Sequence, residues 1–158
     1  MLDTTSTRRL LACMALLGAI GATGCDDDDP AAPDPEPEVE TLRLQLAAGG
    51  GLAAQTVDLD IDGTVTGGPI QLKNGVARAF TASALRADGT AEPLITAADF
   101  ELRVQPAAAS GVVFARSGAF AGTLTGSTNG NTSADFLLWH LEEDHDDFDQ
   151  TAPITVTP

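Results

Sequence analysis

From residue 41 onward, apolar and polar side chains alternate with a period of two in several short stretches. The alternation is clearest at 42–46, 57–61 and 100–104, where three apolar residues are separated by single polar ones. Successive side chains of a strand point to opposite faces of a sheet, so this period predicts strands with one buried face. No window of 11 residues carries a convincing helical stripe.

Turn-forming pairs separate the predicted strands, among them Asp62-Gly63, Asn74-Gly75, Asp88-Gly89 and Asn129-Gly130. Such pairs supply the positive φ values that tight turns require. About seven short strands divided in this way predict an all-β fold, and specifically a single β-sandwich over residues 41–158.

The first 24 residues follow a different pattern. Arg8 and Arg9 precede an apolar run at 10–20, and small residues follow at 21–24. This order is typical of a secretory signal. The 15 residues of 10–24 fall short of the roughly 20 that span a bilayer. We therefore expect a signal peptide over residues 1–24.

The sequence "ATGC" at 22–25 resembles the lipobox of bacterial lipoproteins, although Ala22 stands where that family usually has leucine. The resemblance implies that Cys25 is acylated and becomes the new N-terminus, which would anchor the protein to a membrane. Ordinary secretory cleavage is the alternative. Cys13 lies inside the predicted signal, so the mature chain would form no internal disulfide.

Residues 25–40 are predicted to be a tether. Eight acids and four prolines follow Cys25, with almost no apolar bulk, so the segment cannot bury enough surface to fold. Like charges and prolines favour an extended chain. Together with the lipid anchor, this predicts a protein of the cell envelope, periplasmic or exposed on the outer membrane.

The formal net charge of −15 argues against nucleic acid as a partner, because phosphates require a basic surface. The acids are unevenly distributed: besides the eight in the tether, six lie at 142–149. The rest of the predicted sandwich is close to neutral.

Residues 76–158 carry a more specific resemblance. The stretches "FTASALRADGTAEPL", "FELRVQPAAASGVVFARSGAFAGTLTGSTNGNTSADFLLW" and "PITVTP" resemble the bacterial immunoglobulin-like domains of group 2. The resemblance implies an immunoglobulin-like sandwich that serves as a spacer or adhesive module on the cell surface. It implies no catalytic residues.

Catalytic and calcium motifs are poorly represented. The sequence has no G-x-S-x-G and no tyrosine, and its two histidines lie within six residues of each other, so we expect no enzyme. "DLDIDG" at 58–63 matches the start of a calcium loop, but the twelfth position is Pro69 instead of the required Glu. We expect these aspartates on the solvent face of a strand.

The stretch "WHLEEDHDDFDQ" at 139–150 is the strongest candidate for chemistry, and we expect it to form the loop of the last hairpin. Imidazole together with carboxylate suits zinc or copper better than calcium. The candidate ligands are His140, His145, Glu142, Asp144 and Asp147. The alternative, which the sequence favours, is that His140 only ends a strand while the acids keep a long loop soluble, because two histidines five residues apart share no strand face. Phe148, among these acids, indicates a loop that is held to the sandwich.

A second candidate surface precedes this loop. If Phe136 and Leu138 point into the core, Leu137 and Trp139 point outward and could bind an envelope protein. The opposite orientation would bury Trp139. The sequence therefore predicts a non-catalytic binding or scaffolding module, with divalent metal binding as the alternative and no cofactor unless the loop holds zinc or copper.

Overall fold

The computed structural model describes residues 36–158, and these residues form an all-β domain. Ten strands follow one another along the chain: β1 (Thr41–Leu46), β2 (Gln55–Asp60), β3 (Val65–Thr66), β4 (Ile70–Lys73), β5 (Ala77–Leu85), β6 (Phe100–Pro106), β7 (Val112–Gly118), β8 (Ala121–Gly126), β9 (Gly130–His140) and β10 (His145–Thr157). Within this part of the chain, no helix is long or apolar enough to cross a membrane.

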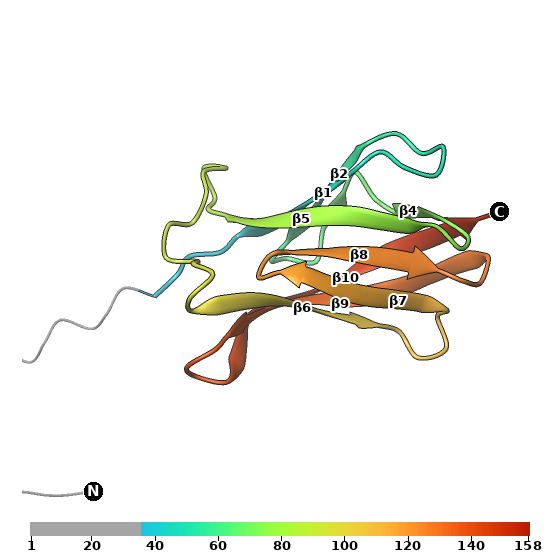
Figure 1. Cartoon of the computed structure of the whole chain (residues 1–158). Coiled ribbons are helices and arrows are strands. Elements are labelled where there is room, and N and C mark those ends of the chain that lie inside the picture. Colours follow the sequence, from blue (N-terminus) through green and yellow to red (C-terminus); the bar gives the residue numbers. More distant parts are fainter. Residues whose placement is uncertain (1–35) are drawn as a thin grey trace, which may run out of the picture. The chain divides into compact units, whose positions relative to one another are not determined.

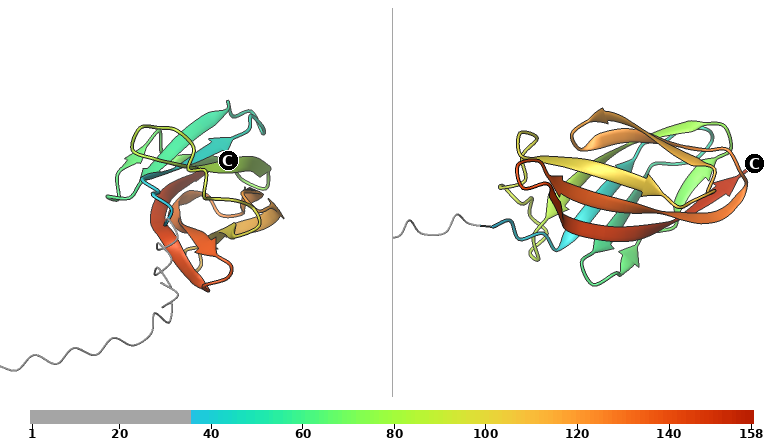
Figure 2. Two further views of the ribbon diagram at one scale, coloured as in Figure 1. Left: turned by 90° about the vertical axis from the view of Figure 1, so that its left-hand side faces the viewer. Right: turned by 90° about the horizontal axis from the view of Figure 1, so that it is seen from below.

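The strands form two sheets that pack as a sandwich (Figures 1 and 2). One sheet has the order β3-β2-β1-β5-β8-β7, and the other has the order β4-β10-β9-β6. All neighbouring strands are antiparallel except β10 and β4, which run parallel. The predicted all-β sandwich is confirmed. It has more strands than the seven or so expected, because strands as short as β3 leave almost no periodic signal.

The core lies between the sheets, where the inward-facing apolar residues of both sheets meet. In β1, Leu42, Leu44 and Leu46 are all at most 3% exposed, as the alternation predicted. Burial of this kind is the main favourable term in folding. The prediction failed at Ile61, which we expected to continue the inward series of β2. That strand ends at Asp60, and Ile61 is 52% exposed because the chain has already turned.

The domain begins slightly earlier than the predicted boundary at residue 41. Val39 is buried in the core. The backbone N–H of Glu40 donates to Leu85 O at 2.9 Å, and Glu38 N donates to the buried carboxylate of Glu92 at 3.2 Å. The last residues assigned to the tether are therefore part of the sandwich. The predicted signal peptide, Cys25 and the tether up to residue 35 lie outside the described residues.

Candidate metal centre

The last hairpin is longer and more regular than the sequence indicated. We expected a loop over 139–150, but β9 continues to His140 and β10 begins at His145, so the loop contains only residues 141–144 (Figure 1). Strand pairing places His140 directly opposite His145. The two imidazole rings are 5.8 Å apart, centroid to centroid. The expectation that the hairpin would not bring the histidines together is wrong, because cross-strand pairing joins residues that share no face along one strand.

A β-bulge at Asp147 explains how this hairpin places Phe148 in the core and Asp147 beside the histidines. Asp146 pairs with Trp139, whereas Phe148 pairs with Leu138, so Asp147 is an extra residue in β10. A bulge inserts one residue and shifts the alternation of the strand. As a result, Phe148 enters the core and is 3% exposed. The expectation that Phe148 ties this segment to the sandwich is confirmed.

The ring of His140 is held by stacking against Phe100 at the start of β6. The two rings lie 4.4 Å apart, centroid to centroid, with an angle of 21° between their planes. The His140 side chain is 20% exposed, so it lies at the rim of the sandwich. An imidazole that packing holds in one orientation loses little freedom when it binds a ligand.

Asp147 faces both histidines. Its Oδ1 lies 2.7 Å from His145 Nε2, and its Oδ2 lies 3.8 Å from His140 Nδ1. Burial lowers the pKa of His145, but its hydrogen bond to Asp147 and the charges of Asp147 and Glu143 outweigh this, so the pKa of His145 is raised above its ordinary value. The carboxylate thus attracts positive charge to this end of the hairpin.

His140, His145 and Asp147 each offer one ligand atom, and these atoms all lie within 4.8 Å of one another. Two imidazole nitrogens and one carboxylate oxygen form a ligand set that suits zinc or copper. Three of the five predicted ligands therefore come together. Glu142 and Asp144 are exposed and do not belong to this group.

Asp144 has a conformational role in the loop. Its φ of 56° lies in the left-handed region, which aspartate tolerates better than most residues. Its N–H donates to His140 O at 3.1 Å and closes the loop. Glu143 is the residue that the sequence reasoning missed: its Oε2 lies 3.5 Å from His145 Nδ1 and 3.8 Å from His140 Nδ1.

The charge around this group is strongly negative. Six acids lie between residues 142 and 149. Among residues 36–158, the ion pairs of Lys and Arg involve other carboxylates, those of Asp58, Glu92 and Glu101. A cluster of acids that forms no ion pair with Lys or Arg raises the local concentration of cations.

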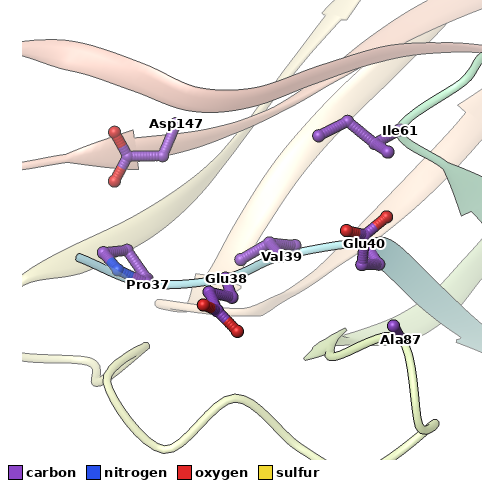
Figure 3. Close-up of a pocket in the computed structure, with 7 residues that line it drawn as sticks. All are labelled: Pro37, Glu38, Val39, Glu40, Ile61, Ala87 and Asp147. Carbon is purple, nitrogen blue, oxygen red and sulfur yellow. The ribbon is translucent and has the colours of Figure 1, made fainter. Parts of the chain in front are cut away.

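Asp147 also lines a shallow pocket of about 440 Å³ beside the start of β1 (Figure 3). The opposite wall of this pocket is the segment of residues 37–40, and Ile61 and Ala87 lie at its far end. The candidate metal centre is therefore next to the point where the chain enters the sandwich.

The three aspartates of the calcium-like sequence do not converge. Asp58 accepts two hydrogen bonds from Arg43, Asp60 accepts one from Thr41, and Asp62 accepts one from the backbone of Thr64. Each carboxylate has its own local partner, which agrees with the expectation that they lie along a strand and its turn.

Leu137 and Trp139 point away from the core, while Phe136 and Leu138 belong to it. This orientation is the one on which the binding-surface hypothesis depends. Leu137 is nevertheless only 7% exposed, and the guanidinium of Arg103 lies 3.8 Å above the ring of Trp139. Neither side chain offers a free apolar patch, because a charged residue already covers the indole.

Fold and site together define an all-β sandwich with a candidate transition-metal centre at the end of its last hairpin. No protein-family model and no curated protein matches the chain.

Proposed function

We propose that this protein binds one divalent transition-metal ion, zinc or copper, through His140, His145 and Asp147. The proposal is carried by the convergence of the three ligand atoms within 4.8 Å at the end of a regular hairpin. Strand pairing and the Phe100 stack hold two of these side chains in place. Zinc sites with three protein ligands of this kind are common, and imidazole is not a ligand that calcium prefers.

We propose further that the domain acts as a non-catalytic binding module of the cell envelope. Support comes from the lipobox-like sequence at Cys25, the acidic sequence after it, and the resemblance of residues 76–158 to immunoglobulin-like domains. Replacing Cys25 by alanine tests the anchor. The variant is expected to leave the membrane fraction, and its retention there would contradict the lipoprotein assignment.

Calorimetric titration of the purified full chain, without a histidine tag, tests metal binding. Zinc and copper are expected to bind with a stoichiometry of one per chain, and calcium is not. A ligand that binds only the folded state must also raise the melting temperature, by an amount that corresponds to about 2.7 kcal/mol at a hundredfold excess over Kd. Absence of heat together with an unchanged melting temperature would refute the proposal.

A matched pair of variants locates the site. Asp147→Asn removes a ligand charge from the proposed centre, whereas Asp146→Asn removes the same charge from the neighbouring residue, which pairs with Trp139 on the outer face. D147N is expected to weaken zinc binding and D146N to leave it almost unchanged. Equal losses would show that the ion responds only to overall charge, and unchanged binding by H140A/H145A would place it elsewhere.

A further inference from the structure

We infer that Glu143 positions His145 for metal binding from outside the coordination sphere, by accepting the imidazole proton of Nδ1. The assignment depends on the proposed metal binding and extends it, because it names the nitrogen through which His145 binds the ion. Two carboxylates face different nitrogens of the His145 ring. Asp147 Oδ1 lies 2.7 Å from Nε2, whereas Glu143 Oε2 lies 3.5 Å from Nδ1.

The proton of the His145 ring decides which nitrogen is free for an ion. A neutral imidazole carries one N–H and one lone pair, so a nitrogen that binds a metal leaves the proton to the other nitrogen. In the proposed centre, His145 shares the ion with Asp147, which lies on the Nε2 side. Coordination through Nε2 replaces the hydrogen bond to Asp147 and places the proton on Nδ1. That proton faces Glu143, whose carboxylate is the one that contacts Nδ1 among residues 36–158.

His145 needs such an acceptor more than His140 does. The His140 ring stacks on Phe100, and its side chain is 20% exposed. The His145 side chain is 47% exposed, and its ring meets the His140 ring edge-on, at an angle of 71°. A hydrogen bond from the second nitrogen fixes both the orientation and the tautomer of a metal-binding histidine. Glu143 therefore supplies at His145 the orientation that packing supplies at His140.

The loop holds Glu143 beside Nδ1 of His145. The next residue, Asp144, has a left-handed conformation, and its N–H closes the loop onto His140 O. The Glu143 side chain is 61% exposed, so it has room to shorten the 3.5 Å contact to the roughly 2.9 Å of a hydrogen bond. The same oxygen lies 3.8 Å from His140 Nδ1, which is too far for a hydrogen bond. Glu142 forms no ion pair with either histidine within the described part of the chain.

In this role Glu143 leaves the ion with three protein ligands, two imidazole nitrogens and one oxygen of Asp147. Zinc with three protein ligands keeps its fourth position for water or another small ligand, unlike the closed structural sites that have four. The centre is therefore open, and Glu143 acts on it only through the orientation of His145.

NMR of the isotope-labelled full chain identifies the nitrogen that binds zinc, because protonated, unprotonated and metal-bound imidazole nitrogens differ in chemical shift. The unmodified chain is compared with Glu143→Ala, Glu143→Gln and the control Glu142→Ala. E143Q retains an oxygen acceptor without the charge, and E142A removes the same charge from the adjacent loop residue. Zinc affinities from competition titration and melting temperatures without metal are measured for all four proteins.

In the zinc-loaded unmodified chain, His145 is expected to bind through Nε2 and to carry a slowly exchanging proton on Nδ1. E143A should lose this slow exchange and bind zinc about tenfold more weakly than E142A, as when an outer-shell partner of a metal ligand is removed. E143Q should lie between these two variants.

Two results would overturn the role of Glu143 while leaving the metal centre in place. One is zinc bound to Nδ1 of His145 in the unmodified chain. The other is equal affinity and equal proton exchange in E143A and E142A, which would leave the hydrogen bond of His145 to the backbone of Glu143 as sufficient. If the unmodified chain binds no zinc, the proposed function itself fails.

Discussion

Replacing Arg78 by methionine tests whether a buried guanidinium holds the loop between β1 and β2 against the sandwich. Arg78 lies on the inward face of β5 and is 3% exposed. Burial lowers the pKa of this guanidinium. Its partners are neutral: it donates to Ala47 O at 3.0 Å, Ala53 O at 2.5 Å, Gln71 O at 2.6 Å and Gln55 Oε1 at 3.0 Å.

Methionine retains most of the apolar stem of Arg78 but none of its donors. Each hydrogen bond to a charged group contributes about 1.5–3 kcal/mol, and an acceptor left buried without a donor costs about 1–3 kcal/mol. In the variant, the cost of burying the guanidinium no longer applies, and water can hydrogen-bond to those acceptors of Arg78 that lie nearest the surface. The contributions of the four hydrogen bonds therefore do not simply add. We expect R78M to lower the free energy of unfolding by about 3 kcal/mol, which corresponds to one or two of these hydrogen bonds to a charged group.

Equilibrium unfolding in urea measures this difference. With a slope of about 2 kcal/mol per molar urea, a loss of about 3 kcal/mol lowers the midpoint by about 1.5 M. The matched control is Arg43→Met, because the Arg43 guanidinium also donates hydrogen bonds, but only two, and both go to the partly exposed carboxylate of Asp58. Exposed ion pairs contribute at most about 1 kcal/mol.

Amide exchange gives an independent measure, since R78M should lose protection first at residues 47–55. A loss below 1 kcal/mol for R78M, or equal losses for R78M and R43M, would refute the reasoning. A loss below 1 kcal/mol would mean that the loop carbonyls are satisfied without the guanidinium, and equal losses would mean that burial adds nothing to its contribution.

Three further predictions concern the core, the acid stability and the outer face. Gly122→Val should destabilise the domain by about 1–3 kcal/mol, as overpacking does, because a Cβ at Gly122 would meet the ring of Phe114 and approach Ala115 O to 2.9 Å. A variant whose melting temperature equals that of the unmodified protein would contradict this packing. The hydrogen-bonded ion pair with Arg86 lowers the pKa of Glu92, so the Glu92 carboxylate contributes to stability above the ordinary value of 4.5, and this contribution is lost as the pH falls through the lowered value. The free energy of unfolding of Glu92→Gln should therefore change less between pH 2 and 6 than that of the unmodified protein. An unchanged pH profile would exclude this role. Trp139→Ala should cost about 1–2 kcal/mol, less than the 3–5 kcal/mol of a core Trp, because the ring lies on the outer face under Arg103; a core-sized loss in urea unfolding would contradict that placement.

The strands that alternate cleanly were predictable, and the irregular ones were not. Leu42 to Leu46 read as half-buried because each inward residue is apolar and each outward one is polar. Gly122 and Gly126 in β8 are inward-facing positions without side chains, so they carry no such signal although Phe114 and Val156 fill the space. Phe148 signalled an ordered hairpin because an apolar ring among acids is favourable only when it is buried.

The ligand set was predictable only in part. Both histidines and Asp147 were candidates because residue type defines coordination chemistry. Whether they meet depends on the register of β9 and β10, and Asp147 reaches them from a bulge. Glu142, Glu143 and Asp144 are equivalent as sequence, and only the four-residue loop distinguishes Glu143, which faces the histidines, from the other two.

The sequence by itself determined the all-β class, the inward face of the strands that alternate cleanly and the uneven charge, because these depend on residue type and on a period of two. Tertiary structure alone decided that His140 and His145 face each other, that Asp147 joins them and that Trp139 is covered by Arg103. These contacts connect residues across strands. Their geometry follows from register, bulges and loop length, which the order of polar and apolar residues does not encode.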